Sequence, residues 1–223
     1  MSFESVNQAP HIAALFAEGA IAYQTQELLP ADSLLPEEQQ FLSKAVPKRI
    51  HEFAGGRACA RAGLAQLGYR AVALPMGSDR VPMWPAGATG SITHTDGFCA
   101  AVVANCADIR ALGLDVESAG SVKPDLWRRV CTPVELALLQ SQDERSALQS
   151  ATLIFSAKEA FYKCQHTLTG QWLRFADISI TIESDFFTVQ PNQSLQIANQ
   201  SPGPWRGRYR YEAGYVITGL CIV

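Results

Sequence analysis

Residues 155 to 163 read FSAKEAFYK, and this stretch decides how the rest of the chain is interpreted. It lies within Ala151–Leu168, a segment that lacks glycine and proline and places its apolar residues at helical spacing. On such a helix Phe155, Glu159 and Lys163 stand four residues apart and fall on nearly one face. Glu159 and Lys163 then fit either an exposed ion pair, worth about 0.2–0.5 kcal/mol, or part of a functional site.

A second acidic pair lies far upstream, in Gly113–Glu117 (GLDVE). In a β-strand Asp115 and Glu117 point to the same face, roughly 6.6 Å apart along the chain, while the neighbouring leucine and valine point into the core. The two carboxylates repel each other by about 2.5 kcal/mol at an effective dielectric constant near 20, so they fit either a solvated strand end or a cation site. If Glu159 joins them, three carboxylates form a hard oxygen site suited to Mg²⁺.

Composition limits the classes of function. With 223 residues, 48% apolar and 17% charged, the chain can form one large domain or two small ones. A formal net charge of −3 gives no argument for nucleic-acid or membrane binding. Its six cysteines lack a C-x-x-C spacing, which is typical of buried residues in a reducing compartment. The N-terminus has no basic region before an apolar core, and the apolar run Phe98–Ala107 is too short to cross a bilayer. We therefore expect a soluble, cytoplasmic protein.

Helical and strand patterns alternate along the chain in two rounds. The first round has a helical pattern over Lys48–Leu67, interrupted by Gly55–Gly56, which indicates close packing or binding there. The second has Lys123–Gln140, where a capping-box signal at Thr132 predicts two helices, and then the FSAKEAFYK helix. This order predicts an α+β chain of two similar halves that meet near Gly113. The expected strands are Ser91–Thr95, Phe98–Asn105, Ala111–Val116, Ile178–Ile182, Phe186–Val189 and Tyr209–Val223.

The basic residues that suit a phosphate are spread over three places. Arg57 and Arg61 lie one turn apart on the glycine-interrupted helix, with Arg49 two turns before Arg57, and Arg80 stands in a loop. An arginine fork binds phosphate oxygens bidentately. His94, near the end of a strand, adds a hydrogen bond or a positive charge. The arginines fit a solvated surface equally well, and His94 fits a structural role.

These motifs, taken together and in order, resemble a known family. Gly113–Glu117 and Phe155–Lys163 look like the paired signatures of the 4′-phosphopantetheinyl transferases. Phe53–Arg57, Pro82–Pro85 and Gly90–Thr95 complete the set. The closest likeness is to the surfactin-type group and its enterobactin-synthetase component D branch. The resemblance implies a pseudo-dimer of two similar α+β halves, residues 1–112 and 113–223, with coenzyme A held between them and the metal-site acids in the second half.

The resemblance also implies a role for each matched residue. Asp115, Glu117 and Glu159 would hold Mg²⁺ against the pyrophosphate of coenzyme A, and Glu159 and Lys163 would be catalytic. The residues that would bind coenzyme A are Arg57, Arg80, Thr93, His94, Lys158 and Lys163. Arg128 and Arg129 are the expected docking residues for a carrier protein, unless they form an ordinary solvated helix face.

The predicted activity is transfer of the 4′-phosphopantetheine arm from coenzyme A to a serine of an acidic apo acyl or peptidyl carrier protein. It would release 3′,5′-adenosine bisphosphate, and it would serve siderophore, polyketide or fatty acid biosynthesis. The protein is expected to be a monomer, without nucleic acid. Two rivals stay open: a metal-dependent phosphodiesterase that uses the same acids, and a non-catalytic module that binds coenzyme A.

Overall fold

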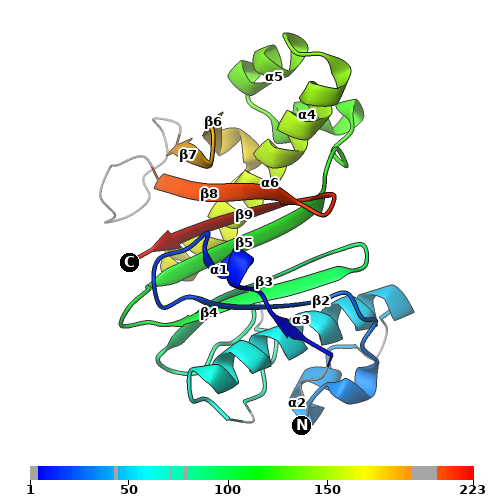
Figure 1. The fold of residues 1–223 in the computed structure, drawn as a ribbon, viewed down its shortest axis with the longest axis vertical. Helices are drawn as coiled ribbons and strands as arrows, with labels where there is room; N and C mark the ends of the chain where they lie inside the picture. The colour runs from blue at the N-terminus through cyan, green and yellow to red at the C-terminus, as the bar shows by residue number, and fades with distance from the viewer. Residues whose placement is uncertain (1–4, 43–44, 71, 78–79, 192–204) are drawn as a thin grey trace. The chain divides into compact units, whose positions relative to one another are not determined.

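Two β-sheets organise the chain, and each is accompanied by helices. The computed structural model describes residues 5–42, 45–70, 72–77, 80–191 and 205–223. The chain divides into two compact units, residues 1–112 with Ile222–Val223, and Gly113–Cys221. Each unit combines a sheet with helices, which confirms the predicted α+β class (Figure 1). None of the helices in the described ranges is both long and apolar enough to cross a membrane.

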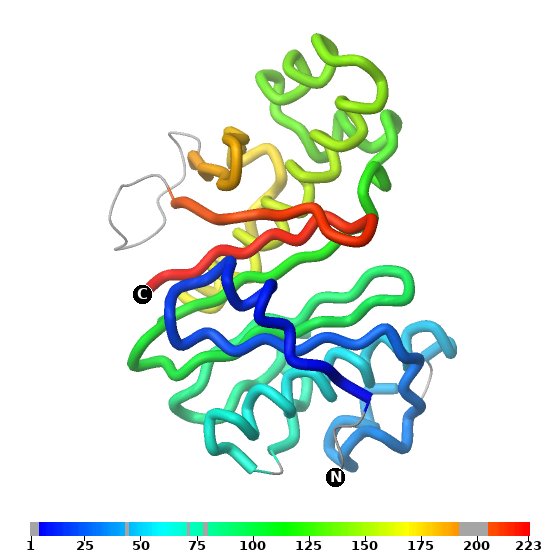
Figure 2. The backbone as a smooth tube through the Cα atoms, viewed as in Figure 1, coloured from blue at the N-terminus to red at the C-terminus, as the bar shows by residue number. Residues whose placement is uncertain are grey.

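The first unit is a four-stranded sheet in the order β1-β2-β4-β3, covered by α3 (Pro47–Gln66). Strands β3 and β4 form a hairpin whose tip holds Gly97 with a positive φ of 69° (Figure 2). The predicted close packing at Gly55–Gly56 is present: a Cβ on Gly56 would come within 2.5 Å of Ile92 Cγ2 on β3. The other elements are β1 Asn7–Gln8, α1 Pro10–Ala13, β2 Ile21–Thr25, η1 Ala31–Ser33, α2 Pro36–Gln39, β3 Ala88–Thr95 and β4 Phe98–Asn105.

The second unit is a five-stranded sheet in the order β5-β9-β8-β7-β6, with α6 as its longest helix. Helix α6 starts seven residues earlier than the pattern predicts, because Asp143 accepts a hydrogen bond from the Ser146 amide and caps it, and it ends at Gly170 in the left-handed conformation. The elements are β5 Ala111–Ser118, α4 Pro124–Val130, α5 Pro133–Gln140, α6 Glu144–Thr169, η2 Phe175–Asp177, β6 Ile178–Ile182, β7 Phe186–Pro191, β8 Trp205–Glu212 and β9 Tyr215–Ile222.

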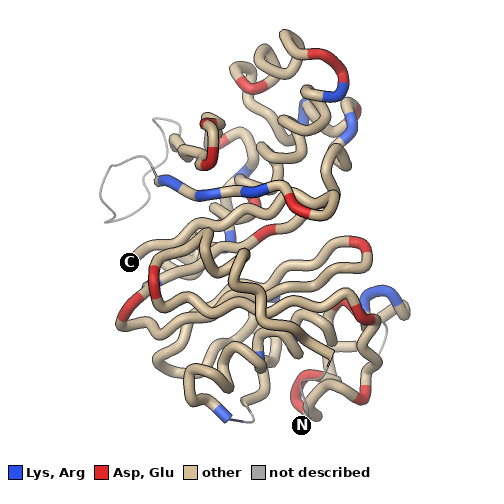
Figure 3. Tube along the Cα trace, viewed as in Figure 1, with Lys and Arg blue, Asp and Glu red and all other residues tan. Residues whose placement is uncertain are grey.

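Two local expectations in this unit have different outcomes. The capping box is confirmed: Thr132 and Glu135 bond reciprocally at the start of α5, and Lys123–Gln140 forms two helices. The single stretch Tyr209–Val223 is wrong, because Ala213 and Gly214 adopt positive φ angles of 50° and 84° and turn the chain into the β8–β9 hairpin. Arginines alternate along β8 and therefore share one face of the strand (Figure 3).

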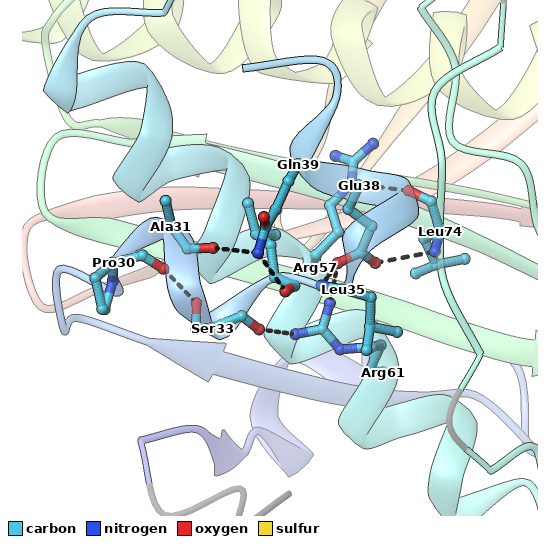
Figure 4. Close-up of polar contacts among 10 residues, drawn as sticks. Pro30, Ala31, Ser33, Leu35, Glu38, Gln39, Arg57, Arg61 and Leu74 are labelled. Atoms are coloured by element: carbon cyan, nitrogen blue, oxygen red, sulfur yellow. Dashed lines mark hydrogen bonds and ion pairs between the residues drawn. The ribbon is translucent and has the colours of Figure 1, made fainter. Parts of the chain in front are cut away.

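A buried ion pair holds the loop after β2 to α3 (Figure 4). Glu38 is fully buried and accepts from Arg61 and from the Leu74 amide, the latter at 2.9 Å. The Glu38 carboxylate also accepts from the Leu35 amide at 3.0 Å and so caps the N-terminus of α2. One carboxylate thus joins three segments of the first unit. Arg61, a candidate phosphate residue in the sequence, is buried in this structural role and also donates to the Ser33 carbonyl at 2.9 Å.

Replacing Glu38 with alanine should strongly destabilise the protein. Arg61 and the Leu74 amide would stay buried without their acceptor, and breaking a buried pair in this way costs about 3–5 kcal/mol. Denaturant unfolding measures the change. The adjacent and exposed Glu37→Ala is the matched control and should shift the free energy of unfolding by less than about 0.5 kcal/mol. Similar losses in the two variants would contradict this assignment.

Candidate functional site

The acids of β5 meet a lysine of α6. The Lys163 ammonium donates to Asp115 Oδ1 at 2.7 Å and to the Leu114 carbonyl at 2.9 Å. Gly113 makes this approach possible, since a Cβ there would lie 1.8 Å from the Ala160 carbonyl oxygen of α6. Lys163 therefore reaches across to the strand, and its side chain stays 29% exposed. An exposed ion pair with Glu159, one of the two alternatives from the sequence, does not account for this contact between Lys163 and Asp115.

Glu117 and Glu159 share the electrostatic environment of that ion pair. Burial, and then the negative charges of Asp115 and Glu159, raise the pKa of Glu117 to about 7, although Lys163 opposes the shift. Burial also raises the pKa of Glu159, where Lys163 again opposes the shift and Asp115 adds to it. Each of these acids thus affects the ionisation of another, as charges a few ångströms apart do. Two carboxyls with raised pKa values near one cation are a candidate acid–base site.

The three acids of this site have oxygen ligands that suit a hard cation, but their side chains are not close enough together to form a complete metal site. All three side chains, Asp115, Glu117 and Glu159, offer oxygen, which is the ligand type that Mg²⁺ prefers. In the part of the chain that the structure describes, no three His, Cys, Asp or Glu side chains are close enough together to hold a metal ion. One oxygen of Asp115 is already bonded to Lys163.

An aromatic cluster lies within one turn of Glu159 along α6. The rings of Phe155 and Tyr162, which precede and follow Glu159 on the helix, both pack against Phe175 of η2, with centroid distances of 5.6 and 5.4 Å. The three rings therefore form an apolar contact that includes the helix positions four before and three after Glu159. Phe175 was not singled out from the sequence, because its contacts come from a separate segment that follows the helix.

Lys158 occupies a different place from the one that its motif predicts. It is fully buried, and its ammonium donates to Glu135 at 2.8 Å and to three backbone carbonyls. All of its hydrogen-bonding capacity is used inside the protein, so this arrangement leaves none for a phosphate. A signal was present in the sequence: Lys158 lies one turn from Ile154 and Phe161, on the apolar face of the helix.

In the first unit, an exposed basic cluster forms where α3 begins. Arg49 Nη1 lies 2.9 Å from His94 Nε2. The Glu52 carboxylate lies near both, 3.7 Å from Arg49 and 3.5 Å from His94 Nδ1. Arginine has only donors, so Nε2 of His94 accepts in this contact. Lys48 pairs with Asp96 at the hairpin tip. A pocket of about 230 Å³ adjoins the cluster and includes Lys48, Glu52 and Asp96 in its lining.

The remaining predicted residues of this unit differ in exposure. Arg57 is buried, donates from Nε to the Leu74 carbonyl at 3.3 Å and stands 3.7 Å from the centre of the Phe53 ring. Burial lowers the pKa of Arg57 to about 10, although Glu38 opposes the shift. Thr93 is buried as well, whereas Arg80 is exposed and has a positive φ of 68°. Sequence reasoning missed Glu52, whose position one turn after Arg49 was its only signal.

Comparison with known proteins covers both units. The family profile "4'-phosphopantetheinyl transferase N-terminal domain" matches residues 37–104, and "4'-phosphopantetheinyl transferase superfamily" matches residues 111–218. The 4'-phosphopantetheinyl transferase Svp of Streptomyces mobaraensis is 35% identical over 86% of this chain and 80% of its own length. PptT of Mycobacterium tuberculosis is 34% identical over 86% of this chain and 88% of its own length. Npt of Nocardia iowensis is 41% identical over 66% of each chain.

The predicted branch is also represented among the relatives. Enterobactin synthase component D of Escherichia coli is 35% identical over 60% of this chain and 63% of its own length. Among solved structures, the holo-[acyl-carrier-protein] synthase of Thermotoga maritima aligns with 51% of this chain at 17% identity and a TM-score of 0.38.

Substituting Gly113 by alanine should disturb the site and the fold together. The new methyl group would overlap the Ala160 carbonyl oxygen of α6, so helix and strand must separate, at a cost of about 1–3 kcal/mol. Denaturant unfolding measures this cost. Gly97→Ala serves as the control, because no atom lies within 4 Å of its new methyl group. This variant should lose only about 1 kcal/mol of stability, through the backbone strain of alanine at a positive φ. A Gly113→Ala protein as stable as wild type would contradict the close approach.

Proposed function

Because this chain belongs to the 4′-phosphopantetheinyl transferase superfamily, we propose that it moves the 4′-phosphopantetheine arm of coenzyme A to a serine of an acidic apo acyl or peptidyl carrier protein. The serine hydroxyl attacks the β-phosphate, the serine oxygen–phosphorus bond forms, and 3′,5′-adenosine bisphosphate leaves. The observation that carries the proposal is the contact between Lys163 and Asp115 beside Glu159. It brings a cation and carboxylates from both family motifs to one place.

Lys163 and Glu159 divide the chemistry between them. The ammonium of Lys163, whose side chain is partly exposed, neutralises charge on the phosphates as the bond to the leaving group breaks. Glu159 accepts the proton of the attacking serine, and its raised pKa brings it closer to neutral pH, where a general base works well. Phe155 and Tyr162, within one turn of Glu159 on α6, pack against Phe175, and this apolar cluster would help to exclude water from the carboxylate.

A divalent cation fits the chemistry of the three acids. Asp115, Glu117 and Glu159 would hold Mg²⁺. Burial and then the negative charge of Asp115 raise the pKa of Glu117, and a bound cation would relieve that repulsion. The ion would neutralise negative charge on the pyrophosphate of coenzyme A.

The nucleotide end of coenzyme A suits the basic cluster of the first unit. Arg49 is exposed beside His94, and a phosphate approaching from solvent would accept hydrogen bonds from its guanidinium. Arg80, exposed in its loop, adds a further contact. Arg57 and Thr93, which the resemblance also assigns to coenzyme A, are buried in this unit.

The carrier protein would dock on the second unit. Arg128 and Arg129 are exposed in the last turn of α4, and Leu126 on the same helix is 39% exposed. Two cations beside an exposed apolar side chain suit an acidic helical partner.

Mass spectrometry of an apo carrier protein incubated with this protein, coenzyme A and Mg²⁺ tests the proposal. The expected result is a mass gain of one phosphopantetheine arm on a serine. Hydrolysis of coenzyme A without a carrier would instead indicate a phosphodiesterase. Binding of coenzyme A without either product would indicate a non-catalytic module. Either of these outcomes contradicts the proposal.

Replacing Glu117 with alanine should lower the rate of Mg²⁺-dependent transfer by about 10²–10³-fold, the usual scale for losing one electrostatic stabiliser. The fold should persist, because Glu117 is only half-buried at the end of β5. Initial rates at several Mg²⁺ concentrations measure the effect, with circular dichroism to check folding. Glu183→Ala, at an exposed acid of the same unit, is the control and should keep full activity. Undiminished turnover in Glu117→Ala would remove this residue from the metal set.

A further inference from the structure

Lys158 joins four segments of the second unit at one point. Its ammonium donates to the Val130 carbonyl at the end of α4 at 2.9 Å and to Glu135 Oε2 in α5 at 2.8 Å. It also donates to the Phe175 carbonyl in η2 at 2.9 Å and to the Ile178 carbonyl in β6 at 3.1 Å. A buried ammonium is retained only with such partners, so these four groups are held at fixed distances from α6.

Glu135 completes this hub and ties in two backbone amides. Its Oε2 accepts from the Thr132 amide and its Oε1 from the Ile180 amide, both at 2.6 Å. The carboxylate is 2% exposed. Glu135 therefore links the start of α5 to β6, while Lys158 links both to α6.

The segments held by the hub are those that border the reaction. Phe175, whose carbonyl Lys158 binds, packs its ring against Phe155 and Tyr162 on either side of Glu159. Val130 directly follows the exposed Arg128–Arg129 of α4. The hub therefore fixes the positions of α4, the proposed docking helix, and of the Phe175 ring relative to Glu159, the residue that follows Lys158.

We propose that Lys158 and Glu135 form a positioning pair, which aligns the docked carrier serine with Glu159, and that Lys158 does not contact coenzyme A. This inference rests on the proposed transferase activity. It differs from the role that the family motif implies for Lys158, and the two roles affect different substrates. A phosphate ligand acts on coenzyme A, whereas a positioning pair acts on the carrier protein.

Steady-state kinetics with each substrate varied in turn separates these roles. Lys158→Met and Glu135→Gln are expected to lower kcat/KM for the carrier by about tenfold or more and to leave KM for coenzyme A within about twofold. His94→Ala is the matched control on the nucleotide side and should raise KM for coenzyme A. Rates are measured well below the unfolding temperature of each variant.

The double variant Lys158→Met/Glu135→Leu separates positioning from stability. Removing both buried charges often restores stability, whereas apolar side chains cannot hold the carbonyls of Val130, Phe175 and Ile178. Unfolding free energy should therefore recover toward wild type while kcat/KM for the carrier stays low. Recovery of both quantities would show a purely structural role and overturn the inference.

Hydrogen exchange gives a readout that does not depend on turnover. The Thr132 and Ile180 amides, which donate to Glu135, should exchange faster in Lys158→Met than in wild type. Unchanged exchange, or a KM for coenzyme A that rises as in His94→Ala, would overturn the inference alone. A wild-type protein that labels no carrier would overturn the proposed function and this inference with it.

Discussion

A charge that leaves water must find its hydrogen-bond partners inside the protein, and this constraint shapes both units. In the first unit Glu38 accepts from Arg61 and two backbone amides, and so joins α2, α3 and the segment at Leu74. In the second unit Lys158 and Glu135 do the same for α4, α5, α6, η2 and β6. Such pairs add little net stability compared with apolar packing, but each tolerates few alternative arrangements.

The same constraint separates motif residues that support the site from those that can meet a ligand. Lys158 has its donors occupied within the protein, and Arg61 is buried and directs its two terminal nitrogens to Glu38 and Ser33. Lys163 keeps part of its side chain in solvent while it contacts Asp115, and Arg49 and His94 remain accessible on the other unit. Burial and partners, more than residue type, therefore decide which basic residues belong to the proposed chemistry.

Close backbone approach is the second device that builds the site. Gly113 admits α6 against β5, so that the ammonium of Lys163 reaches the carboxylate of Asp115. In the first unit Gly56 on α3 leaves room for the side chain of Ile92 on β3. A family motif that begins with glycine thus has a steric reason as well as a chemical one.

The sequence by itself determined the helix of FSAKEAFYK, the strand of GLDVE, the capping box at Thr132 and the family, because these depend on residue spacing within short segments. It also placed Glu159 and Lys163 on one helix face. Only the tertiary structure decided that Lys158, about 140° around the helix from Lys163, points into the interior. Its partners Val130, Glu135, Phe175 and Ile178 come from segments that no local pattern relates to one another. The exposure of a charged side chain depends on what packs over it, and that is settled only when the separate segments of the chain come together.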